Sequence, residues 1–222
     1  MPTLQRAGAV SAIAGAVVLL VATLLHPMSA DPADPAAAFA EYAAARAWVA
    51  SHLGQFLGVG LMFVGLYALR ASLAGGPADW LAGLALAFAL AALGTAAVLQ
   101  AVDGVALKLT VDRWAAAAAP QRQSAFDAAF AVRQIEIGVA SSLGLLFGVS
   151  ALLFGMAIIG SGIYPIWLGG LAVVAGAGTA AGGTLTAFAG FSPLAMNVAM
   201  PSNLLMLVWI AVTGAVMWRR AG

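Results

Sequence analysis

Seven polar residues, all near the same predicted depth in an otherwise apolar chain, could form one chemical site. They are His26, His52, Gln55, Gln100, Asp103, Arg133 and Glu136. Their side chains offer imidazole nitrogens, amide and carboxylate oxygens and one guanidinium, which can bind a polar headgroup or a metal ion. Polar groups inside a membrane are costly, so their positions carry functional information.

Spacing places six of these residues in pairs, each pair on one face of a predicted helix. Side chains three positions apart lie on the same helix face. The pairs are His52 with Gln55, Gln100 with Asp103, and Arg133 with Glu136. Several helices therefore present polar groups near the outer interface of a membrane.

Three interpretations of this constellation stay open. The residues could be interfacial side chains that pair with one another, for example Arg133 with Asp103 or Glu136. They could line a pocket for a lipid-like or small amphiphilic ligand at the outer leaflet. They could hold a metal ion or haem through His26 and His52. We predict the second, a non-enzymatic binder of such a ligand or of a partner subunit, without a cofactor; haem or zinc is the alternative.

An enzymatic role is not favoured by the arrangement of nucleophiles and bases. Ser51 precedes His52 directly, and adjacent helical side chains do not face each other. We therefore assign no catalytic residue.

Composition indicates what must position these residues. The chain has 222 residues, of which 64% are hydrophobic and 8% charged, with a net charge of +1 and no cysteine. A soluble domain carries about a quarter charged residues, so the lipid bilayer is the expected surroundings. No basic face is available for nucleic acid, and thiolate metal sites and disulfides are excluded. The frequent use of Ala, Gly and Val indicates a GC-rich bacterial genome.

Six apolar stretches are long enough to cross a hydrocarbon core of roughly 30 Å. They cover about 7–26, 48–69, 80–101, 137–159, 164–187 and 203–218. The predicted fold is all-α, a single membrane domain (1–222) of six transmembrane helices. The first stretch is long for a signal peptide and is expected to be retained. Asp34 and Pro35 form a predicted helix start, and residues 36–47 are expected to extend the second span beyond the bilayer.

Charge and tryptophan positions favour cytoplasmic termini in a bacterial inner (plasma) membrane. The basic residues on the side of the termini are Arg6, Arg70, Arg219 and Arg220. Acidic residues gather on the other side, where the basic residues sit on long helical extensions. The tryptophans expected at the inner interface are Trp80, Trp167 and Trp218, and those expected at the outer one are Trp48 and Trp114.

A short repeat relates the second and fourth spans. Residues 49–60 (VASHLGQFLGVG) and 139–150 (VASSLGLLFGVS) are identical at seven of twelve positions, and 202–204 repeats the S-x-L pattern. Three tandem helical hairpins would produce this pattern, and so would chance in a low-complexity alphabet. Parallel repeats occur in transporters, so secondary transport of a small molecule is an alternative function.

Three Gly-x-x-x-Gly motifs predict close helix packing inside the bundle. They are Gly54 with Gly58, Gly144 with Gly148, and Gly178 with Gly182. Oligomerisation through the same glycine-rich faces is the alternative use of these motifs.

The junction of the fourth and fifth spans, FGMAIIGSGIYPIWLGGLAVVAGAG, carries a Gly-rich helix, a Ser-Gly-x-x-Pro turn and a Leu-Gly helix. The matching residues are Gly155, Ser161, Gly162, Pro165, Leu168 and Gly169. Over residues 145–220 the chain resembles the bacterial membrane-protein family known as domain of unknown function 4386. The resemblance implies a multispan fold and supplies no activity or catalytic residue.

Overall fold

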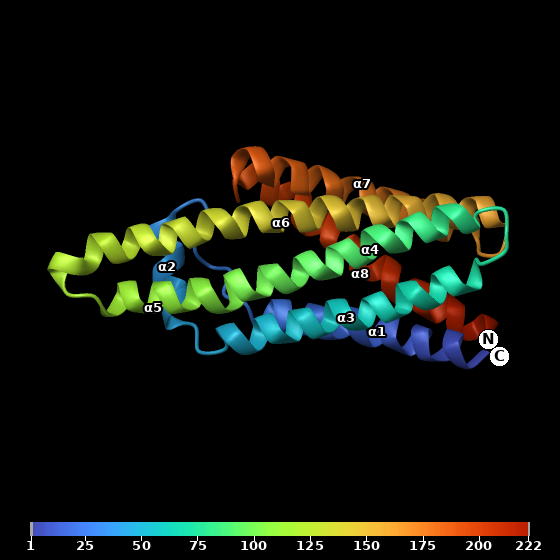
Figure 1. Cartoon of the computed structure of the whole chain (residues 1–222), viewed down its shortest axis with the longest axis horizontal. Coiled ribbons are helices and arrows are strands. Elements are labelled where there is room, and N and C mark those ends of the chain that lie inside the picture. Colours follow the sequence, from blue (N-terminus) through green and yellow to red (C-terminus); the bar gives the residue numbers. More distant parts are fainter. Residues whose placement is uncertain (1, 222) are drawn as a thin grey trace.

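The computed structural model describes residues 2–221, and within them the chain is 87% helical with no strand (Figure 1). The first elements are α1 (Pro2–Leu24), α2 (Pro35–Ala44), α3 (Trp48–Ser72) and α4 (Asp79–Leu99). The π-helix η1 (Gln100–Leu107) and α5 (Lys108–Ala116) continue α4, and α6 (Ala119–Ser161), α7 (Ile166–Ala189) and α8 (Pro193–Arg220) complete the chain. The predicted all-α fold is confirmed.

Six helices are long and apolar enough to cross a membrane, as predicted. Two of them are much longer than a bilayer requires. The continuous helix Asp79–Ala116 has 38 residues and Ala119–Ser161 has 43, whereas about 20 residues span the hydrocarbon core. Both extend at the end of the molecule that also carries α2 (Figure 1). We call this end, formed by α2, α5 and the first turns of α6, the α2 end.

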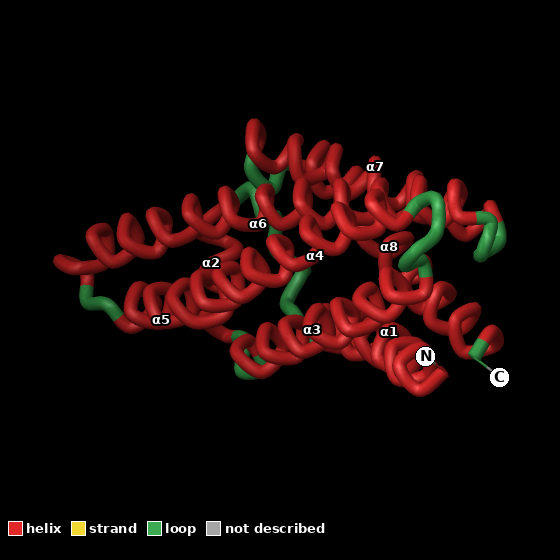
Figure 2. Tube along the Cα trace, turned by 45° about the vertical axis from the view of Figure 1, so that its right-hand side comes forward, coloured by secondary structure: helices red, strands yellow, loops and turns green. Residues whose placement is uncertain are grey.

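The six spanning helices form a closed ring in chain order. Contacts join α1 to α3, α3 to α4, α4 to α6, α6 to α7 and α7 to α8, and α8 returns to α1. Each span therefore packs against the next one along the chain, and the three repeated hairpins stay a prediction. Both termini lie together at the end opposite α2 (Figure 1), and short loops join the helices (Figure 2).

Small residues allow neighbouring helices to approach each other closely. A Cβ atom on Gly148 of α6 would lie 2.5 Å from the backbone nitrogen of Ala180, and one on Gly176 of α7 would lie 2.6 Å from the oxygen of Gly148. Lipid tails are as apolar as leucine, so close van der Waals contact rather than the hydrophobic effect joins such helices. The predicted role of the glycine motifs in packing within the bundle is confirmed for Gly144 and Gly148, which both lie against α7.

The predicted extension of the second span by residues 36–47 is wrong. Asp34 caps α2 by accepting hydrogen bonds from the backbone of Ala36 and Ala37, as expected, but α2 stops at Ala44. Lys108 of α5 donates to the carbonyl oxygens of Tyr42 and Ala43, at 3.1 and 3.0 Å. This contact stabilises the C-terminal end of α2 beside α5, so α2 is a separate short helix.

The close approach of α6 and α7 predicts a position-dependent effect of adding one methyl group. Gly148→Ala should lower the stability of the detergent-purified protein by about 1–3 kcal/mol, because the new methyl overlaps the α7 backbone. Thermal unfolding followed by size-exclusion chromatography measures this change.

The matched control is Gly138→Ala in the same helix, where an added Cβ meets nothing within 4 Å. That substitution should be neutral or stabilising, since alanine favours a helix over glycine. Equal losses in the two variants would contradict the packing account.

Candidate functional site

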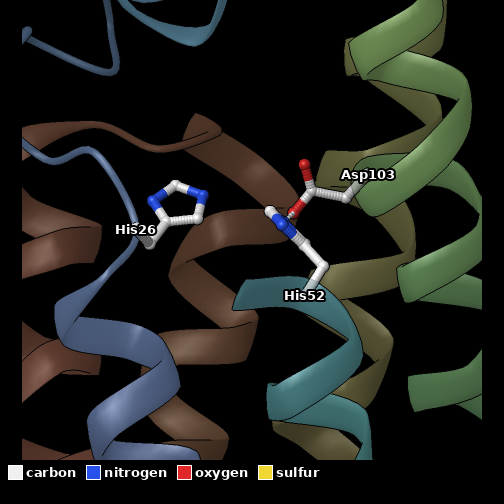
Figure 3. Close-up of side chains that lie close together, drawn as sticks. All are labelled: His26, His52 and Asp103. Atoms are coloured by element: carbon white, nitrogen blue, oxygen red, sulfur yellow. Dashed lines mark hydrogen bonds and ion pairs between the residues drawn. The ribbon is translucent and has the colours of Figure 1, made fainter. Parts of the chain in front are cut away.

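Three of the predicted residues converge at the α2 end: His26, His52 and Asp103. One ligand atom from each lies within 4.8 Å of the other two. His26 follows the end of α1, His52 lies in the first turns of α3, and Asp103 belongs to η1. Figure 3 shows the His26 ring facing the paired side chains of His52 and Asp103. We call these three residues the His–Asp cluster.

The π-helix positions Asp103 against α3. His52 Nε2 lies 3.0 Å from Asp103 Oδ2, and the indole nitrogen of Trp48 donates to the Asp103 carbonyl at 3.1 Å. Gly104 allows this approach, because a Cβ there would lie 2.8 Å from the Cβ of His52. π-Helical turns are frequent at functional sites.

Both histidines are held by a backbone carbonyl at the same ring nitrogen. His52 Nδ1 lies 2.8 Å from the Trp48 oxygen, and His26 Nδ1 lies 2.7 Å from the Pro27 oxygen. A carbonyl oxygen can only accept a hydrogen bond, so each Nδ1 carries the proton. In the neutral ring this leaves Nε2 with a free lone pair.

Aromatic rings surround the two histidines. The Trp48 ring lies 4.7 Å from the His26 ring and 4.6 Å from the His52 ring, centroid to centroid, and Tyr42 packs on Trp48 at 4.4 Å. Burial lowers the pKa of His26, and the nearby His52 ring lowers it further. Both effects favour the neutral form of the His26 ring.

A second set of buried polar side chains lies next to the His–Asp cluster, and Tyr42 contacts both sets. Arg133 of α6 donates to Glu136 at 3.2 Å, to the Tyr42 hydroxyl at 3.0 Å and to the Pro32 carbonyl at 3.2 Å. Arg133 and Glu136 are each only 4% exposed. They form a buried pair that connects α6 to α2 and to the chain before it, and one of the predicted pairings of Arg133 is thus confirmed.

The seven predicted residues fall into three groups. Five take part in the contacts above: His26, His52, Asp103, Arg133 and Glu136. Gln100 precedes Asp103 on η1, and within residues 2–221 both Gln100 Oε1 and Asp103 Oδ1 are buried acceptors with no hydrogen-bond partner. Gln55 is half-buried. Within residues 2–221 its side chain makes no hydrogen bond to any of the other six predicted site residues.

Sequence reasoning missed two members of the site, Tyr42 and Trp48. Tyr42 is one of only three tyrosines, yet nothing in the alanine-rich segment around it indicates that α2 folds back on the helix ends. Trp48 was expected at the outer lipid interface and is instead 1% exposed, because it packs between the histidines. By contrast, the side chains of Trp80, Trp167 and Trp218 are exposed, as expected for residues facing the membrane.

The surroundings of His52 limit the chemistry of the cluster. Ser51 Oγ does lie 3.4 Å from His52 Nδ1, contrary to the expectation that the two side chains would not meet. Its hydroxyl, however, donates to the Trp48 carbonyl at 2.9 Å, as His52 Nδ1 also does. Ser51 is thus placed as a structural hydroxyl and not as a nucleophile activated by a base.

A groove of about 580 Å³ lies between α4 and α6, and it is separate from the His–Asp cluster. Its lining residues are Ala91, Gly94, Thr95, Val98, Gln134, Ile135, Gly138, Val139 and Ser142. None of the seven predicted site residues lines this groove.

Comparisons with protein-family models, with curated proteins and with solved structures found no match. The resemblance of residues 145–220 to domain of unknown function family 4386 therefore stays a prediction. What the chain itself establishes is a multispan helical membrane protein with a buried polar group of residues at one end.

Breaking the buried Arg133–Glu136 pair should strongly lower the stability of the protein, and removing the second charge as well should restore much of it. Arg133→Met should destabilise the protein by about 3–5 kcal/mol, because it leaves the Glu136 carboxylate buried without its cation. The double variant Arg133→Met with Glu136→Gln should recover much of this loss. Thermal unfolding in detergent compares the variants.

The control is Asp112→Asn, which breaks the half-exposed pair with Lys108 on α5. Its cost should not exceed about 1 kcal/mol, as for other solvent-exposed pairs. A double variant less stable than Arg133→Met alone would contradict the assignment.

Proposed function

We propose that the protein is a non-enzymatic membrane protein that binds a small cationic ligand in the polar site at its α2 end. The binding role follows the prediction from sequence, whereas the proposed class of ligand differs from the lipid-like or amphiphilic one predicted there. We propose a small cation in place of the lipid-like amphiphile for two reasons: the site contains buried acceptors without a donor, and it is closely enclosed.

The observation that carries this proposal is a surplus of buried acceptors. Asp103 Oδ1 and Gln100 Oε1 are buried without a donor among the described residues. The charge of Glu136 is balanced by Arg133, and the His52 ring is tied to the Trp48 carbonyl. Buried polar atoms are normally satisfied, and an exception indicates an ion or water that completes the site. A ligand that donates hydrogen bonds or carries positive charge would complete this one.

Enclosure favours a small ligand. His52 is 1% exposed, and Trp48 packs against both histidine rings, with Tyr42 of α2 packed on Trp48 and beside His26. A lipid headgroup would need these rings to move apart. A porphyrin faces the same obstacle, because Trp48 contacts both histidine rings.

The proposed orientation places the α2 end outside the bacterial inner membrane and both termini in the cytoplasm. Arg6 and Arg220 lie on the helices that begin and end the chain, and their guanidinium groups rest on Trp218 and Tyr164. Basic residues next to short loops favour the cytoplasmic side. The site would then take its ligand from the periplasmic side.

Ligand binding predicts a cation-dependent rise in melting temperature. Protein stripped with chelator and desalted is heated in mild detergent with Na⁺, K⁺, Mg²⁺, Ca²⁺, Zn²⁺ or ethylammonium. At least one cation at saturating concentration should raise the melting temperature by about 5 °C, because a ligand bound only to the folded state stabilises it. Asp103→Asn should abolish the shift.

The matched control is Asp127→Asn, the same change at an exposed position on α6, which should keep the shift. No shift with any of these cations, or an equal shift in Asp103→Asn, would contradict the proposal. Native mass spectrometry of the untreated protein tests the alternative, since a retained lipid lost in Asp103→Asn would favour the amphiphile. Substrate flux in liposomes would instead favour secondary transport.

A further inference from the structure

The His–Asp cluster contains an unfavourable contact unless something positive lies within it. His52 Nδ1 carries its proton toward the Trp48 carbonyl, so the lone pair of Nε2 points at Asp103 Oδ2, 3.0 Å away. Two acceptors at this distance repel each other. Either a proton or a metal ion must lie between them.

A proton would satisfy only part of the cluster. It would join His52 Nε2 to Asp103 Oδ2 and leave Asp103 Oδ1 buried without a partner. It would also give no role to the His26 ring, whose Nδ1 is already bound to the Pro27 carbonyl. One metal ion could contact all three side chains at once.

We propose that the cluster is a binding site for a divalent transition-metal ion, with Zn²⁺ the best match, held by Nε2 of His26, Nε2 of His52 and the carboxylate of Asp103. This inference rests on the proposed cation site and names the class of cation. Three protein ligands leave the fourth position of a tetrahedral ion to water.

The ligand distances are near those that a tetrahedral ion requires. Zinc binds histidine nitrogen at about 2.0–2.1 Å, which places two ligand atoms roughly 3.3 Å apart. The His52 Nε2–Asp103 Oδ2 distance of 3.0 Å is already close to this value, and no pair in the cluster exceeds 4.8 Å. A movement of His26 by about 1.5 Å would complete the site. His26 lies just past the end of α1, and its ring hydrogen-bonds through Nδ1 to the carbonyl of the next residue, Pro27, so the ring and this carbonyl would move together.

The hydrogen bonds around the cluster are those of metal-binding histidines. Such residues donate their other ring N–H to a carbonyl or carboxylate, which fixes the ring and leaves one nitrogen free for the metal. Both His26 and His52 have this arrangement, through the carbonyls of Pro27 and Trp48. Two unrelated segments of the chain therefore present the same nitrogen to one point.

The donor set also selects the class of metal. Imidazole nitrogen suits Zn²⁺, Cu²⁺, Ni²⁺ and Fe²⁺, whereas Mg²⁺ and Ca²⁺ prefer sites made of oxygen ligands alone. The single carboxylate and two neutral rings give the site one negative charge, since Arg133 and Glu136 neutralise each other. A bound ion would join the end of α1 to α3 and η1.

Metal binding is tested on detergent-purified protein that carries a tag without histidine and has been stripped with chelator. Titration calorimetry with ZnCl₂ and elemental analysis after desalting should give one Zn²⁺ per chain. Co²⁺ in place of Zn²⁺ should give the visible absorption bands of a tetrahedral site with nitrogen and oxygen ligands. A large excess of Mg²⁺ or Ca²⁺ should not displace either ion.

Removing any ligand should weaken Zn²⁺ binding by at least about 100-fold, because loss of a mere supporting contact already costs 10–100-fold. The variants are His26→Ala, His52→Ala and Asp103→Asn, and Asp127→Asn is the matched control that should keep wild-type affinity. His26→Ala is the decisive variant, because His26 lies outside the helices. Its ring packs against Trp48 and His52, so the melting temperature of the metal-free variant is compared with that of the wild type. Melting temperature without metal confirms that each variant is folded.

The outcomes separate this inference from the proposal on which it rests. If Zn²⁺ and Co²⁺ do not bind while another cation still raises the melting temperature through Asp103, the metal site is wrong and the cation site stands. If no cation has an effect, both are wrong. Zn²⁺ binding that survives in the folded His26→Ala variant, or that Mg²⁺ displaces, would also overturn the metal site.

Discussion

Hydrocarbon offers no hydrogen-bond partner to a polypeptide backbone, and this constraint governs the whole molecule. Each crossing segment must satisfy its own amides, which makes helices the only available element here. Because lipid competes equally for apolar side chains, the helices are held by backbone proximity, as where Gly148 of α6 meets Gly176 of α7. The same constraint drives charged side chains toward the helix ends, where they must find one another or water.

The buried polar side chains that could bind a ligand are gathered at the α2 end. Two buried polar groups lie there next to each other, the His–Asp cluster and the Arg133–Glu136 pair, with Tyr42 of α2 between them. Arg133 also binds the Pro32 carbonyl, and Glu41 accepts from the backbone of Ser29 and Ala30. The chain between α1 and α3 is thus fastened over the helix ends, and the histidines are shielded from water by protein and not by lipid.

The sequence predicted the spans well and the site only in part, for a physical reason. Hydrophobic length is a local property, so all six crossings were found from runs of about 20 residues. At the end of α2, the Ala43 carbonyl accepts from Lys108, 65 positions further along the chain, a contact that the alanine-rich sequence does not signal. Within the π-helix, Gly104 likewise lies against His52, 52 positions earlier in the chain. Pair spacing correctly placed Arg133 with Glu136, whereas Gln55 shares a helix with His52 without joining its contacts.

The closed ring of helices also limits when the fold can be completed during synthesis. One of the two ring neighbours of α1, the helix α8, is synthesised after the other four spanning helices. Until then, the face of α1 that accepts Gly214, where an added Cβ would lie 2.7 Å from the Ala9 oxygen, is open to lipid or to the insertion machinery. The ring of helices can therefore close only after α8 has been synthesised.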